Sequence, residues 1–179
     1  TFFLTSTLRG GIFGNIYFIG TKPSSTHLIG TGEGLIIIDP GCPQNFYLVI
    51  DNIYRLGFNP RDVKLIIITH GHYDHLGAVR AFIELSGAKT YIGEADAPYA
   101  DGTLDLTWAR EISCEYNEAF NPDFLLRDGD IISLGNTKIK CISTPGHTPG
   151  TFSFFFEAIN GNESRLCGMF GGVGFNSMQ

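Results

Sequence analysis

The chain has 179 residues, of which 43% are hydrophobic and 17% are charged. This length and composition are sufficient for one domain with a buried core, and we expect that domain to span residues 1–179. Its formal net charge of -6 offers no basic stripe for a nucleic-acid partner, and no stretch approaches the ~20 apolar residues of a membrane span. Its four cysteines form no Cys-x-x-Cys pair, which excludes a zinc ribbon and leaves the cellular compartment open.

The first part of the chain predicts three strands. Residues 15–19 and 26–31 have the pattern of short strands, and residues 34–38 form a strongly apolar strand that ends at Asp39, just before Pro-Gly. Two interpretations of Asp39 stay open. Its carboxylate holds a metal-bound imidazole in one tautomer, or it makes an Asx turn before the Pro-Gly pair.

An amphipathic helix and a further apolar strand follow. Apolar residues recur at helical spacing from Phe46 to Leu56, and Gly57 marks the end of this helix. The run at residues 65–68 is β-branched and too short for a helix, so it predicts a strand covered on both faces.

Directly after that strand, six residues carry three imidazoles and a carboxylate: His70, His72, Asp74 and His75. In an extended continuation of the strand, side chains two apart point the same way, so His70 and His72 reach one ion. Asp74 and His75 lie one step further along and suit a second ion a few Å away. Because neutral imidazole is the commonest metal-binding side chain, we expect a metal site here rather than a solvated loop that happens to be rich in histidine.

A parallel crossover unit comes next. Residues 78–85 predict a short helix that ends at Ser-Gly, and residues 90–92 predict a strand. A helix near residues 94–100 begins a long irregular stretch, and stretches of that length in compact domains tend to wall a site. We expect the pocket walls to include Tyr99, Trp108 and Phe120.

The last third of the chain predicts four strands. Residues 131–134 and 137–142 form a hairpin across Gly-Asn, and residues 151–156 and 165–170 form two further strands. Between these pairs, His147 lies in the turn Thr-Pro-Gly-His-Thr-Pro-Gly. A stiff turn at a strand end suits a fixed metal ligand, and a surface histidine is the alternative.

Three features together resemble the metallo-β-lactamase superfamily: the His-x-His-x-Asp-His run from His70, the strand that ends at Asp39-Pro40-Gly41, and the Thr-Pro-Gly-His turn at His147. The resemblance implies an α/β fold, a four-layer αββα sandwich with a di-metal site, usually of zinc, at one edge of the two sheets. One or two zinc ions are therefore the expected cofactor. The resemblance assigns the first metal to His70, His72 and His147, and the second to Asp74 and His75.

Narrower features, at Gly14-Asn15, residues 56–58 and residues 87–89, are similar to the His-rich di-zinc subclass of true β-lactamases. Many thioesterases of the superfamily place a metal-bridging Asp after the strand that corresponds to residues 165–170, and this chain has Gly171 and Gly172 there. The absence of that carboxylate favours a lactamase-like site.

A further histidine ligand is expected in a segment beyond Gln179, and the chain has no histidine after His147. We therefore expect a domain truncated at the C-terminus, without its final strand and helix. The second metal would then bind weakly, and a homo-oligomer is expected through the open sheet edge beside residues 165–170.

The resemblance implies a zinc-dependent hydrolase in which metal-bound hydroxide, oriented by Asp74, attacks the carbonyl of a small-molecule substrate. Hydrolysis of a β-lactam ring is the leading hypothesis. The alternatives are a thioester or lactone hydrolase of the same superfamily and a catalytically impaired metal-binding module. Flavodiiron oxygen reductases carry Glu in place of the second histidine, so His72 argues against iron redox chemistry, and nuclease members need an added domain and a basic surface. A true β-lactamase would be periplasmic or secreted, and the other hydrolases cytoplasmic.

Overall fold

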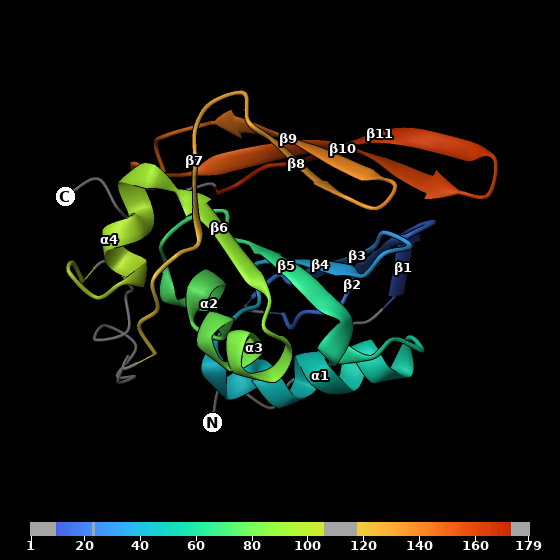
Figure 1. Ribbon diagram of the computed structural model, residues 1–179, viewed down its shortest axis with the longest axis horizontal. Helices are drawn as coiled ribbons and strands as arrows, with labels where there is room; N and C mark the ends of the chain where they lie inside the picture. The colour runs from blue at the N-terminus through green and yellow to red at the C-terminus, as the bar shows by residue number, and fades with distance from the viewer. Residues whose placement is uncertain (1–9, 23, 106–117, 173–179) are drawn as a thin grey trace.

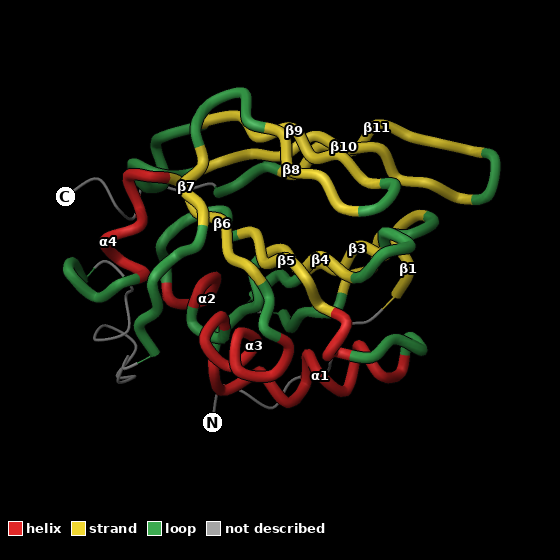
Figure 2. The backbone as a smooth tube through the Cα atoms, viewed as in Figure 1, coloured by secondary structure: helices red, strands yellow, loops and turns green. Residues whose placement is uncertain are grey.

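Two β-sheets face each other, and helices cover the outer face of the larger sheet (Figure 1). The computed structural model describes residues 10–22, 24–105 and 118–172. Figure 2 shows the resulting layers, with most of the helices below, the seven-stranded sheet in the middle and the four-stranded sheet above.

The larger sheet has the strand order β1-β2-β3-β4-β5-β6-β7. The pairs from β1 to β4 are antiparallel, and the pairs from β4 to β7 are parallel. Its strands are β1 (Gly10–Phe13), β2 (Ile16–Phe18), β3 (His27–Gly30), β4 (Leu35–Ile38), β5 (Val63–Ile67), β6 (Lys89–Gly93) and β7 (Phe124–Leu126).

The smaller sheet is antiparallel, in the order β11-β10-β9-β8. Its strands are β8 (Ile131–Leu134), β9 (Thr137–Ser143), β10 (Phe152–Asn160) and β11 (Glu163–Met169). The helices are α1 (Phe46–Arg55), α2 (Tyr73–Leu76), α3 (Val79–Ser86) and α4 (Ala97–Ala100), with 3-10 turns η1 (Pro43–Asn45), η2 (Pro60–Asp62) and η3 (Glu94–Asp96).

The apolar run of β4 is buried on both faces, as its composition predicts. Leu35 and Ile37 belong to the core between the helices and the larger sheet, whereas Ile36 and Ile38 belong to the core between the two sheets. Successive side chains of a strand point to opposite faces, so a strand between two cores must be apolar throughout. This burial fixes the carboxyl end of β4, where Asp39 follows.

The smaller sheet instead alternates between buried and exposed residues. In β10, Phe154 and Phe156 pack in the core between the sheets, while Phe155 is 44% exposed on the outer face. The edge strand β11 presents Leu166, which is 75% exposed. In the part of the chain that the structure describes, no helix lies on this outer face, so three of the four expected layers are seen (Figure 1). No helix among these residues is long and apolar enough to cross a membrane.

Most of the elements lie where the sequence predicts them. The first predicted helix is α1, followed by Gly57 at φ 87°, and the second is α3, capped by Gly87 in the left-handed conformation. The hairpin of β8 and β9 pairs Leu134 with Thr137 across the two-residue turn.

Two expectations are wrong. The chain does not continue as an extended strand after Ile67, because bends occupy residues 69–71 before α2 begins at Tyr73. Phe120 is not a pocket wall, since it is 6% exposed and packs in the core beneath the larger sheet. Trp108 lies outside the described residues.

Candidate metal centre

The candidate site lies at the carboxyl ends of three adjacent parallel strands. Asp39 follows β4, the histidine cluster follows β5, and Asp96 closes the short turn after β6. Carboxyl ends of parallel strands meet at one edge of a sheet, which is where ligands bind in open α/β sheets. The backbone N–H of Phe152 donates to the carbonyl of Thr69 at 2.9 Å, and this bond joins the smaller sheet to the same edge.

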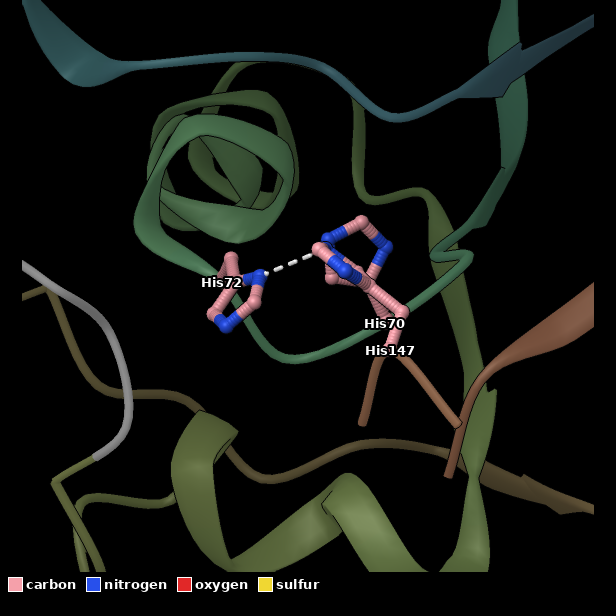
Figure 3. Close-up of side chains that lie close together, drawn as sticks. All are labelled: His70, His72 and His147. Atoms are coloured by element: carbon pink, nitrogen blue, oxygen red, sulfur yellow. Dashed lines mark hydrogen bonds between the residues drawn. The ribbon is translucent and has the colours of Figure 1, made fainter. Parts of the chain in front are cut away.

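Three imidazoles converge at this edge, from two loops that are far apart in sequence (Figure 3). One nitrogen each of His70, His72 and His147 lies within 4.8 Å of the other two. His72 Nδ1 is 3.0 Å from His147 Nε2. Two nitrogens bound to one tetrahedral zinc ion at about 2.05 Å would be ~3.3 Å apart, so this pair is already close to that spacing.

His70 is held in one tautomer by its backbone surroundings. Its Nδ1 is 2.9 Å from the carbonyl oxygen of Gly171, which only accepts hydrogen bonds, so Nδ1 carries the proton and donates. His70 Nε2 is then unprotonated, and it is buried without a hydrogen-bond partner. A buried polar atom without a partner is costly unless a ligand completes it, and an unprotonated imidazole nitrogen is a metal ligand. The residues present therefore fit a zinc ion.

Burial keeps the rings of His70 and His72 neutral. It lowers the pKa of His70 well below its usual range, with the charges of His75, His72 and His147 acting in the same direction. Burial, together with the charges of His147 and His75, lowers the pKa of His72 to about 4. Neutral imidazoles at neutral pH are the form that binds metal.

Asp74 and His75 form a separate pair on the short helix α2. His75 Nε2 is 3.5 Å from Asp74 Oδ2, and the Asp74 side chain is 44% exposed at the rim. The ring of His75 lies against that of His70, with 4.0 Å between the ring centroids. Within the described ranges, these two residues are not part of any group of three candidate ligands. The division of the five residues into two metal sites stays a prediction.

Asp39 makes the contact with an imidazole that one of its two interpretations predicts. Its Oδ2 lies 2.8 Å from His75 Nδ1, which donates to it and leaves Nε2 facing Asp74. The same carboxylate accepts hydrogen bonds from the backbone N–H and the hydroxyl of Thr69, at 2.8 Å and 2.7 Å. These partners lie 30 residues away, so the carboxylate links two strand ends instead of making a local Asx turn.

The pKa of His75 reflects this contact. Burial lowers it, but the charge of Asp39, the hydrogen bond to Asp39 and the charge of Asp74 together raise the pKa above its ordinary value. The network continues from Thr69, whose hydroxyl is also 2.9 Å from His70 Nδ1. One buried carboxylate thereby orients ligands of both candidate sites.

Asp96 was not among the predicted site residues, although its carboxylate contacts both loops of the triad. It is fully buried and accepts a hydrogen bond from the backbone N–H of Gly71 at 2.8 Å and from that of Gly150 at 2.7 Å. The available signal was its position in the turn that follows the strand β6, at the same sheet edge as Asp39 after β4. Tyr99, predicted as a wall, packs beside Gly71 in this region.

Comparisons with known proteins agree with this geometry. A family model described as the metallo-beta-lactamase superfamily matches residues 19–158. A probable metallo-hydrolase of Bacillus subtilis, YflN, is 32% identical over 155 residues, which cover 79% of this chain and 55% of that protein. A hydroxyacylglutathione hydrolase of Francisella philomiragia is 30% identical over 131 residues, which cover 70% of this chain and 43% of that protein.

Among solved structures, the crystal structure of BJP-1, a subclass B3 metallo-beta-lactamase of Bradyrhizobium japonicum, superposes with a TM-score of 0.81 and 34% identity. That match covers 92% of this chain and 62% of BJP-1, and the chain spans about half the length of the curated relatives it matches. The family match contains the whole strand-end cluster, and the fold agrees with the predicted sandwich class. This chain belongs to the metallo-beta-lactamase superfamily.

Proposed function

We propose that this chain forms the metal-binding part of a zinc-dependent hydrolase that opens β-lactam rings. The observation that carries the proposal is the convergence of His70, His72 and His147, with one nitrogen of each within 4.8 Å of the others. Three imidazole ligands suit zinc better than the hard cations that prefer oxygen ligands.

The chain's own residues have separate roles in this proposal. His70, His72 and His147 would hold a first zinc ion, and Asp74 and His75 would hold a second. Bound zinc would supply a Lewis acid that polarises a carbonyl and activates water.

Asp74 is the proposed catalytic residue. Its side chain is 44% exposed, so substrate and water reach it, while its backbone carbonyl accepts a hydrogen bond from the Ser24 hydroxyl. Held in this way at the rim, Asp74 Oδ2 would orient the attacking water and accept its proton. No protein nucleophile is required.

The segment after β11 supports a lactamase-like site. Gly171 contributes its carbonyl to His70, and a Cβ on Gly172 would meet His147 Cδ2 at 2.6 Å. A carboxylate side chain at either glycine would therefore collide, since a Cβ on Gly171 would meet a backbone oxygen at 1.9 Å. The similarity to BJP-1 favours the same substrate class.

Two other functions stay under test because specific observations favour them. The similarity to a hydroxyacylglutathione hydrolase favours a thioester substrate. The small number of ligands described beside Asp74 and His75 favours a weak second site and, in the extreme, a metal-binding module without activity.

The deciding experiment assays zinc-loaded protein against a chromogenic cephalosporin, a thioester and an acyl lactone. We expect turnover of the cephalosporin, a large loss of turnover in Asp74→Asn, and normal turnover in Asp51→Asn, which removes an exposed carboxylate of α1. Preferred turnover of the thioester or lactone would replace the substrate assignment. Zinc binding without turnover of any of the three would favour the binding module.

A further inference from the structure

A buried carboxylate lies between the two loops that carry the candidate zinc ligands, and neither the family motif nor the proposed reaction uses it. Asp96 belongs to the 3-10 turn after β6 and is fully buried. Its hydrogen-bond partners are 25, 52 and 54 residues away in sequence. A buried charge is stable only when it is paired or fully hydrogen-bonded, so these partners account for its presence.

The partners of Asp96 lie within three residues of a triad histidine in the sequence. Oδ2 accepts from the backbone N–H of Gly71, which lies between His70 and His72 in the chain. The same oxygen accepts a short hydrogen bond from the hydroxyl of Thr148, the residue after His147. Oδ1 accepts from the backbone N–H of Gly150 at 2.7 Å. One side chain thus ties both ligand loops together.

Three glycines allow this close approach. A Cβ on Gly150 would lie 2.6 Å from the carboxylate carbon of Asp96, and a Cβ on Gly93 would lie 2.1 Å from the carbonyl oxygen of Gly150. A Cβ on Gly71 would meet the ring of Tyr99 at 2.8 Å. The segment from Gly93 to Tyr99 is therefore packed against both loops at points where a Cβ on the glycines would not fit.

The hydroxyl of Thr148 is itself oriented. Its oxygen is 2.8 Å from the hydroxyl of Thr151, and Thr151 Oγ1 in turn accepts from the backbone N–H of Thr148 at 2.9 Å. With Thr151 donating to it, the Thr148 hydroxyl directs its proton to Asp96. The turn that carries His147 is thereby tied to the carboxylate at two points, Thr148 and Gly150.

We propose that Asp96 is a positioning residue that holds the His70–His72 loop against the His147 loop and so sets the spacing of the three imidazoles and their affinity for zinc. The inference rests on the zinc site of the proposed function and is independent of the substrate. Outer partners that orient metal ligands typically change metal affinity about 10- to 100-fold when they are replaced.

Asp96→Asn is the main test variant. The asparagine has the same shape, but its amide group presents N–H bonds to at least one of the three donors, so at least one tie is lost. Thr148→Val removes a single tie at nearly constant volume, and Thr148→Ser restores the hydroxyl. Asp123→Asn is a more exposed control at the other end of β6. Asp123 also accepts three hydrogen bonds, from Thr90 N, Thr90 Oγ1 and Lys89, and all of these partners lie outside the two ligand loops.

Two quantities are measured on the same purified chain: zinc affinity by competition with a chromogenic chelator, and the visible spectrum of the cobalt-substituted protein, which reports ligand geometry. Urea unfolding of the metal-free variants measures stability separately. We expect zinc affinity to fall about 10- to 100-fold in Asp96→Asn, with a changed cobalt spectrum. We expect a smaller loss in Thr148→Val, recovery in Thr148→Ser, and no change in Asp123→Asn.

The proposal is overturned if Asp96→Asn binds zinc as tightly as the parent with an unchanged cobalt spectrum. It is also overturned if Asp123→Asn weakens zinc binding as much at an equal loss of stability, because the effect would then follow folding alone. If Asp96→Asn does not fold, an unchanged zinc affinity in Thr148→Val overturns the proposal. A parent chain that binds no zinc defeats the proposed function together with this inference, whereas tight zinc binding without hydrolysis defeats only the proposed substrate chemistry.

Discussion

Replacing Asp39 by asparagine should lower the unfolding free energy of the metal-free protein by about 2 kcal/mol. Asp39 is 5% exposed and accepts three hydrogen bonds, two from Thr69 and one from His75. Its backbone has φ 54°, a left-handed conformation that asparagine also tolerates. The substitution therefore changes hydrogen bonding without adding backbone strain.

Either orientation of the new amide leads to a similar cost. If its oxygen replaces Oδ2, its NH2 group opposes the backbone N–H of Thr69, and one buried unpaired donor costs about 1–3 kcal/mol. If its oxygen replaces Oδ1, bonds to a charged acceptor, worth about 1.5–3 kcal/mol each, become neutral bonds worth about 0.5–1.5 kcal/mol. The second orientation also moves the proton of His75 to Nε2, which removes that nitrogen as a ligand.

Urea unfolding at pH 7 measures the change, and a thermal melt should show a midpoint lower by ~4–8 °C, since each kcal/mol shifts the midpoint of a domain this size by about 2–4 °C. Asp51→Asn is the control, because it removes an exposed partner of Arg55 that contributes about 0.5 kcal/mol or less. A loss in Asp39→Asn no larger than in this control would refute the assigned hydrogen bonds.

Three further predictions concern pH, packing and association. Burial lowers the pKa values of His70 and His72, so below about pH 6.5 these two imidazoles bind protons in the unfolded chain but not in the folded one. Their contribution to the unfolding free energy of the metal-free protein should therefore fall as pH drops toward 4, and a flat profile in urea titrations would contradict this. Gly93→Ala should lower the unfolding free energy by more than about 2 kcal/mol, because its Cβ would lie 2.1 Å from a backbone oxygen. Gly11→Ala is the control and should be nearly neutral, because a Cβ there would have nothing within 4 Å. Equal melting temperatures of the two variants would count against the packing described. Leu166 is 75% exposed on the edge strand β11, so we expect the chain to self-associate through this edge. Leu166→Lys should then shift the protein toward monomer in analytical ultracentrifugation. Identical sedimentation of the two proteins would argue against this edge as the interface.

Local pattern predicted much of this structure. The apolar runs became β4 and β5 because each lies between two cores, and a run of isoleucines at strand length has few other stable placements. The histidine cluster was correctly placed at a strand end because it follows the apolar run that forms β5. The interpretation of Asp39 as a partner of an imidazole also followed from position, since it ends a neighbouring parallel strand.

Long-range contacts account for what local pattern missed. The bends at residues 69–71 are held by hydrogen bonds to Asp39 and Asp96, which are distant in sequence. The strand β7 has only three residues and exists because it pairs with β6. Phe120 was predicted as a pocket wall because it is an aromatic residue in a long irregular stretch. Its backbone N–H instead donates to the carbonyl of Ala100, and its ring is buried.

A crystal structure of zinc-loaded protein, with anomalous differences recorded on both sides of the zinc edge, would show directly whether the three histidines bind zinc. We expect a strong zinc peak among His70, His72 and His147, with His70 bound through Nε2 and His72 through Nδ1, and a weaker peak or none between Asp74 and His75. A zinc peak bound elsewhere, or full zinc content retained by His147→Ala, would contradict the proposed metal centre.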